Sequence, residues 1–120
     1  MTLDLLELVV EIVRKVLNKE CPNFPHGYCY EFSCLLMKVL KHMGFKAKML
    51  YLPNMKHYLL YLPEENIYID GTIDQFMETI QFIYTEPLKY LVHDEPIEVD
   101  DCIVGNEEEL LDKIYKEIYG

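Results

Sequence analysis

The stretch KHYLLYLPEENIYID, residues 56–70, decides the fold of this chain. Residues 56–62 and 67–70 are rich in Tyr, Leu and Ile, which is typical of β-strands, and the PEEN segment between them is typical of a turn. We therefore predict a β-hairpin here. Residues 46–52 have a similar composition and run into Pro53-Asn54-Met55, so they predict a further antiparallel strand.

The register of this hairpin places two polar side chains on one face. With Leu62 opposite Ile67, the loop sets Leu59 opposite Asp70, and His57 lies two residues before Leu59. Directly opposite residues point to the same side of a sheet, so His57 and Asp70 become diagonal neighbours with Cα atoms roughly 7 Å apart. An odd number of loop residues would place them on opposite faces. The sequence therefore predicts a hydrogen bond between this imidazole and this carboxylate.

Helical periodicity lies on both sides of the strands. Residues 3–19 place polar side chains at helical spacing among Leu and Val, and residues 29–43 form a second amphipathic segment that Gly44 ends. Residues 107–119 predict a last helix, because they begin with three glutamates directly after Asn106.

The region between Phe76 and this last helix has a weaker pattern. Residues 79–85 and 90–93 fit short strands or helical turns equally well. The order helix, helix, three strands, weakly patterned segment and helix indicates an α+β fold. We expect a single domain over residues 1–120, with the N-terminal helices packed on an antiparallel sheet.

Composition and charge exclude several classes of protein. Hydrophobic residues make up 51% of the chain, too many for a disordered protein. The 21 acidic residues outnumber the 11 basic ones and give a net charge of −10. Nucleic acids and anionic membranes both select clustered Lys and Arg, so neither is an expected partner. The net charge does not indicate which substrate is used, and the sequence leaves the oligomeric state open.

The N-terminal segment and the cysteines predict a location. Residues 1–16 are apolar but are interrupted by Asp4, Glu7 and Glu11, which is typical of an amphipathic helix and not of a signal peptide or membrane span. We therefore expect a cytoplasmic protein, in which thiols stay reduced. An even number of cysteines would allow two disulfides, but without an export signal we expect four free thiols, at Cys21, Cys29, Cys34 and Cys102.

Cys29 is the strongest candidate for a reactive side chain. It begins the predicted helix 29–43, and the positive end of a helix dipole favours the thiolate form of a cysteine. Cys34 is the weaker candidate, since it falls on the charged side of the same helix. The competing interpretation of Cys29 is an ordinary small buried residue. Its place shortly before His57 and Asp70 favours a nucleophile, a base and an orienting carboxylate.

Two motifs make this arrangement recognisable. One is FPHGYCYEFS at residues 24–33, the other is IDGTIDQF at residues 69–76, and the strand between them carries His57. Together they resemble the transglutaminase-like branch of the papain-fold cysteine enzymes. The sequence departs from the family pattern at Tyr58, where Trp often follows the histidine, and at Gly71, where Pro often follows the aspartate.

The resemblance implies a papain-like core, no cofactor and no metal, and it assigns roles to residues. Cys29 is implied to be the nucleophile, His57 the base and Asp70 the orienting acid. Papain-fold enzymes commonly carry a side-chain amide six residues before the nucleophile, which is implied here to be Asn23, an oxyanion donor beside the Cys29 backbone N–H. The neighbouring residues predicted to line the substrate pocket are Gly27, Tyr28 and Tyr30.

The predicted function is therefore thiol-dependent acyl transfer by a cysteine protease, an amidase or deamidase, or a transglutaminase, through a thioester intermediate. The expected substrate of such an enzyme is a protein or peptide. One alternative is a catalytically silent member of the same fold that binds another protein. Another is a domain held by structural zinc, although the ligand spacing fits no standard zinc finger. The soft ligands available for zinc are Cys21, His26, Cys29, Cys34 and His42.

Overall fold

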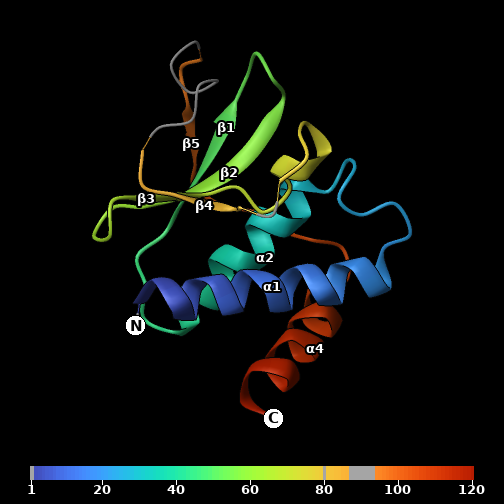
Figure 1. Cartoon of the computed structure of the whole chain (residues 1–120). Helices are drawn as coiled ribbons and strands as arrows, with labels where there is room; N and C mark the ends of the chain where they lie inside the picture. Colours follow the sequence, from blue (N-terminus) through green and yellow to red (C-terminus); the bar gives the residue numbers. More distant parts are fainter. Residues whose placement is uncertain (1, 80, 87–93) are drawn as a thin grey trace.

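The computed structural model describes residues 2–79, 81–86 and 94–120, and over these residues the chain is an α+β fold (Figure 1). Three helices accompany a five-stranded antiparallel sheet. The elements in chain order are α1 (Thr2–Glu20), α2 (Cys29–His42), β1 (Lys48–Leu52), β2 (His57–Leu62), β3 (Ile67–Ile69), the 3₁₀ helix η1 (Ile73–Gln75), β4 (Ile83–Tyr84), β5 (Ile97–Val99) and α4 (Glu107–Tyr119).

The sheet has the strand order β4-β3-β2-β1-β5, and its central hairpin has the predicted register. Leu62 pairs with Ile67, as the sequence predicts. The β1–β2 and β2–β3 loops both have four residues, begin with proline, and end with a residue at positive φ, Lys56 (φ 52°) and Asn66 (φ 55°). A loop with an even number of residues between β2 and β3 keeps His57 and Asp70 on the same face of the sheet.

The two edge strands are less well predicted than the centre of the sheet. Among the described residues of the segment 79–85, the structure forms the two-residue strand β4. The sequence does not predict β5, which pairs with β1 through Met49 and Val99. The segment 90–93 lies outside the described residues.

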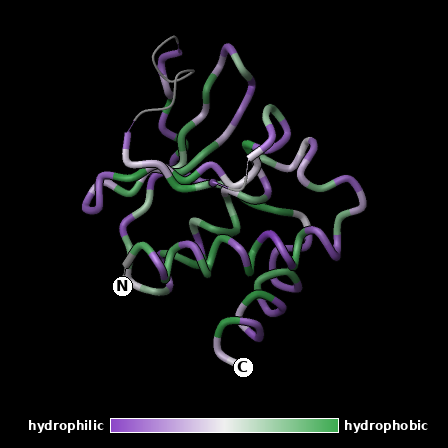
Figure 2. The backbone as a smooth tube through the Cα atoms, in the orientation of Figure 1, coloured by the Kyte–Doolittle hydropathy of each residue, from purple (hydrophilic) through white to green (hydrophobic). Residues whose placement is uncertain are grey.

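Helix α2 is the centre of the molecule. It packs against β1 and β2 on the sheet and against α1 and α4 on its other sides. The buried residues of α2 extend from Phe32 to Leu40. In Figure 2, α4 alternates between hydrophobic and hydrophilic positions. Of the two N-terminal helices, α2 therefore packs on the sheet directly, and α1 covers α2.

A disulfide between Cys34 and Cys102 corrects the expectation of four free thiols. The Cα atoms are 5.9 Å apart and both side chains are buried. Periodicity alone places Cys34 on the charged side of its helix, but the segment before α4 covers that side, where Lys38 pairs with Glu107. Disulfides persist in oxidising compartments, so this bond weighs against the cytoplasmic location expected from the sequence.

Among the described residues no helix combines the length and the apolar character needed to cross a membrane.

Candidate active site

The centre of the candidate site is a buried pair formed by His57 and Asp70. Nε2 of His57 and Oδ2 of Asp70 are 2.8 Å apart, and both side chains are 0% exposed. His57 begins β2, and Asp70 follows the last residue of β3. The observed register of the hairpin therefore allows the hydrogen bond that we predict from the even number of loop residues.

This environment changes the protonation of His57. Burial by itself lowers the pKa of the imidazole, because the interior disfavours a charge. Hydrogen bonds with Asp70 and Cys29, together with their negative charges, act in the opposite direction and raise the pKa of His57 from 6.5 to about 9. At neutral pH the imidazole is therefore mostly protonated.

Cys29 lies at the first residue of α2, beside this imidazole. It is a free, half-buried cysteine, and it lies close enough to His57 to contribute to the raised pKa of the imidazole. Because Asp70 engages Nε2, the other ring nitrogen, Nδ1, is the one available to the thiol. Gly27, at φ +79°, makes the left-handed turn that leads the chain into the helix. The structure thus brings all three predicted residues together.

Backbone and ring contacts hold the Asp70 side of the site. The N–H of Asp70 donates to the carbonyl of Phe82 at 2.8 Å, which attaches this residue to the segment before β4. Its Oδ1 accepts the N–H of Thr72 at 3.4 Å. The ring of Phe76 meets His57 edge-on, with centroids 4.9 Å apart. The carboxylate and imidazole are therefore restrained on several sides.

Asp74 forms an ion pair with Arg14 of α1. Its two carboxylate oxygens accept hydrogen bonds from both terminal nitrogens of Arg14, at 3.0 and 2.8 Å. Arg14 also donates to the carbonyl of Gly71, and its guanidinium stacks on the rings of Phe24 and Phe82. One arginine of α1 therefore fixes the segment that follows Asp70.

Gly71 lies where the chain passes close to α2. A Cβ atom built at this position would overlap the ring of Phe32, which is buried in α2. The chain passes so close to the helix here that only glycine fits.

The other predicted site residues have different surroundings. Asn23 is exposed in the turn before α2, and its carbonyl accepts the N–H of His26 at 2.9 Å, so its part in oxyanion binding stays a prediction. The hydroxyl of Tyr28 shares a hydrogen bond with Cys21, a thiol whose pKa is raised by burial. The hydroxyl of Tyr30 accepts the N–H of Ile103 at 3.0 Å, which turns it toward the segment before α4.

Two residues without a role assigned from the sequence organise the loops of the site. The amide of Gln75 accepts the N–H of Gly27 at 3.3 Å and donates to Thr72 Oγ1 at 3.2 Å. The buried carboxylate of Asp94 accepts the N–H groups of Asn54 (3.1 Å) and Met55 (3.3 Å), in the loop just before His57. Gln75 lies inside the motif IDGTIDQF at residues 69–76, whereas Asp94 has no sequence signal.

Comparisons with protein-family models, curated proteins and solved structures find no match for this chain. The resemblance to transglutaminase-like enzymes therefore stays a prediction from the two motifs and His57.

The zinc alternative loses one of its ligands. Cys34 is bonded to Cys102 and has no thiolate to offer a metal. Among the residues that the structure describes, no three His, Cys, Asp or Glu side chains are grouped so that they could hold a metal ion.

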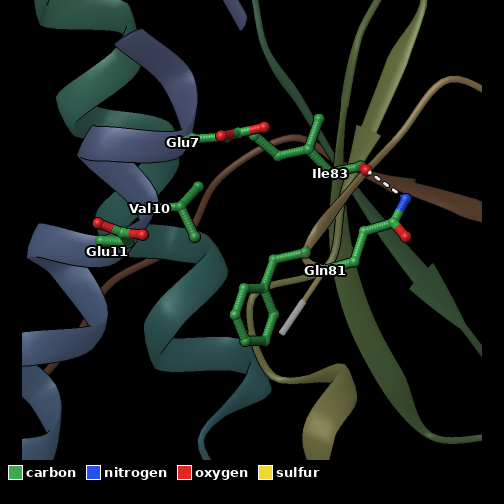
Figure 3. Close-up of a pocket in the computed structure, with 6 residues that line it drawn as sticks. Glu7, Val10, Glu11, Gln81 and Ile83 are labelled. Atoms are coloured by element: carbon green, nitrogen blue, oxygen red, sulfur yellow. Dashed lines mark hydrogen bonds between the residues drawn. The ribbon is translucent and has the colours of Figure 1, made fainter. Parts of the chain in front are cut away.

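A separate groove lies between α1 and the segment that leads into β4 (Figure 3). It encloses about 190 Å³. Glu7 and Glu11 line one side, and Gln81 on the other side donates a hydrogen bond to the carbonyl of Ile83 at 3.2 Å. None of the residues that line it belongs to the candidate triad.

Proposed function

We propose that this protein is a thiol-dependent acyl-transfer enzyme that acts on amide or related acyl bonds of a peptide or protein. The observation that carries the proposal is the buried 2.8 Å hydrogen bond between His57 and Asp70, beside a free cysteine that contributes to the raised pKa of the same imidazole. The two sequence motifs that resemble transglutaminase-like enzymes support the same chemistry.

The first half of the reaction forms a thioester. With a pKa of about 9, His57 is an imidazolium at neutral pH, which stabilises a neighbouring thiolate at Cys29. The thiolate attacks the carbonyl carbon, and the resulting oxyanion lies near the N–H groups that open α2, which have no partner within the helix. His57 then gives its proton to the leaving amine as the C–N bond breaks.

The second half releases the acyl group. The neutral His57 takes a proton from the incoming water or amine, which attacks the thioester carbonyl, and Cys29 leaves as a thiolate. Asp70 accepts a hydrogen bond from Nε2 throughout, and so fixes the imidazole orientation and stabilises its charged form. Water as acceptor gives a protease, amidase or deamidase, and an amine gives a transferase.

Acylation by p-nitrophenyl acetate tests the proposal without knowledge of the natural substrate. We expect a burst of about one p-nitrophenolate per protein chain, which Cys29→Ala abolishes. Cys21→Ala is the matched control, since Cys21 is the other free cysteine and should leave the burst unchanged. Added methylamine then reports whether an amine accepts the acyl group faster than water does.

Alkylation by iodoacetamide at pH 7 gives an independent measurement. We expect Cys29 to react about 100-fold faster than Cys21, because the imidazolium favours one thiolate and burial disfavours the other. Similar rates at both thiols, with no burst, would contradict the enzyme and favour a catalytically silent binding module.

A further inference from the structure

The side chain of Gln75 joins the two loops that carry the candidate triad. Its Oε1 accepts the N–H of Gly27, two residues before Cys29, and its Nε2 donates to Oγ1 of Thr72. The N–H of Thr72 in turn donates to Oδ1 of Asp70. A continuous series of hydrogen bonds therefore runs from the turn before the nucleophile to the carboxylate that holds the imidazole.

We propose that Gln75 is a positioning residue that holds Cys29 in register with His57. This inference rests on the proposed function. Cys29 and the His57–Asp70 pair belong to different parts of the fold, α2 and the hairpin β2–β3. The Gln75 amide is a direct side-chain link between the turn at Gly27 and the segment after Asp70.

A primary amide suits this position because it accepts and donates at once. The Oε1 of Gln75 accepts the N–H of Gly27, and the Oγ1 of Thr72 accepts the amide N–H. Glutamate keeps the acceptor for Gly27, and the hydroxyl of Thr72 has a proton of its own to donate to the carboxylate. Methionine keeps the length of the side chain and loses both bonds.

The test compares variants at Gln75 by the rate of Cys29 alkylation with iodoacetamide at pH 7. We expect Gln75→Met to react about tenfold more slowly than the wild type, and the pH at which alkylation reaches half its maximum to rise, because the imidazolium and the thiol no longer keep their register. Gln75→Glu should stay within about threefold of the wild type. Gln81→Met is a matched control for loss of an exposed glutamine, and it should react at the wild-type rate.

A double variant asks whether Gln75 and Thr72 act together. Thr72→Val removes Oγ1 and keeps the backbone N–H that Asp70 accepts. If Gln75 and Thr72 act through their mutual hydrogen bond, Cys29 in the double variant Gln75→Met/Thr72→Val reacts no more slowly than in Gln75→Met alone. Effects that multiply would overturn the link.

Hydrogen exchange of the wild-type protein tests the link without any variant. The Gly27 amide belongs to an exposed residue, so its exchange is slow only if the bond to Gln75 holds in solution. Fast exchange at Gly27 would overturn the positioning role, and so would alkylation of Gln75→Met at the wild-type rate. In either case, an intact p-nitrophenyl acetate burst would leave the proposed function standing. Absence of the burst in the wild type would overturn the function itself.

Discussion

Helix α2 is held in two different ways along its length. At its first residue, Cys29 is a half-buried free thiol beside the imidazole of His57. Little more than one turn later, Cys34 is completely buried and covalently bonded to Cys102. Two cysteines of one helix therefore have opposite chemistry because of what covers them. We expect changes near Cys29 to affect reactivity, and changes at Cys34 to affect stability.

The largest expected effect is that of Asp70→Asn on the reactive end. An amide at this position holds the imidazole in the wrong tautomer and cannot stabilise its charged form, so acylation by p-nitrophenyl acetate should fall roughly 10³-fold. Burst kinetics at pH 7 measure this change. A decrease in the acylation rate of less than about tenfold would show that Asp70 has no catalytic role.

Removal of the disulfide should produce the largest loss of stability. Cys34 and Cys102 are 68 residues apart in sequence, and opening a loop of this length costs about 4 kcal/mol of unfolding free energy in the chain-entropy description. Urea unfolding of the Cys34→Ala/Cys102→Ala variant measures the loss. Cys29 should still react within a few-fold of the wild-type rate. A large loss of its reactivity would contradict the expectation that changes at Cys34 affect stability and that changes near Cys29 affect reactivity.

Stability should also depend on pH through His57. Its folded-state pKa of about 9 exceeds the unfolded value of 6.5, so its contribution is complete below about pH 6.5 and is lost as pH rises through 9. The difference between the folded and unfolded pKa values of His57 corresponds to about 3 kcal/mol of unfolding free energy. Urea unfolding at several pH values measures the decline, which His57→Gln should remove. An equal decline in that variant would assign the effect to another group.

The smallest expected effect is that of Asp74→Asn. This variant loses one carboxylate of the half-buried ion pair with Arg14, which should lower the unfolding free energy by about 1–2 kcal/mol. Acylation should stay within about threefold of the wild type, because the carboxylate of Asp74 pairs with Arg14, whereas Asp70 is the carboxylate bonded to the imidazole. A rate loss as large as that of Asp70→Asn would make Asp74 part of the reactive group.

The centre of the fold could be predicted from the sequence because its determinants are local. Strand composition and an even loop length suffice to set Leu62 opposite Ile67, and they bring His57 to Asp70. The helix start at Cys29 likewise follows from the proline- and glycine-containing turn before it. Neighbouring residues decide each of these features.

The missed features depend on residues far apart in the chain. Periodicity assumes that a helix buries one face, whereas α2 is covered on several sides, and this error hid the burial of Cys34. Arg14 and Asp74 are 60 residues apart, and their pairing has no local pattern. The edge strand β5 has only three residues, and Ile97 within it is 54% exposed, so hydrophobicity does not predict it.

The disulfide also gives the chain a covalent ring. The disulfide between Cys34 and Cys102 closes a loop of backbone that contains all five strands of the sheet, including His57, and also Asp70. Cys29 precedes Cys34 and lies outside this loop. A protease that cuts the backbone once inside this loop therefore cannot release the base and the acid from the helix that carries the thiol. Such a nicked molecule would migrate as one chain on a non-reducing gel and as two after reduction.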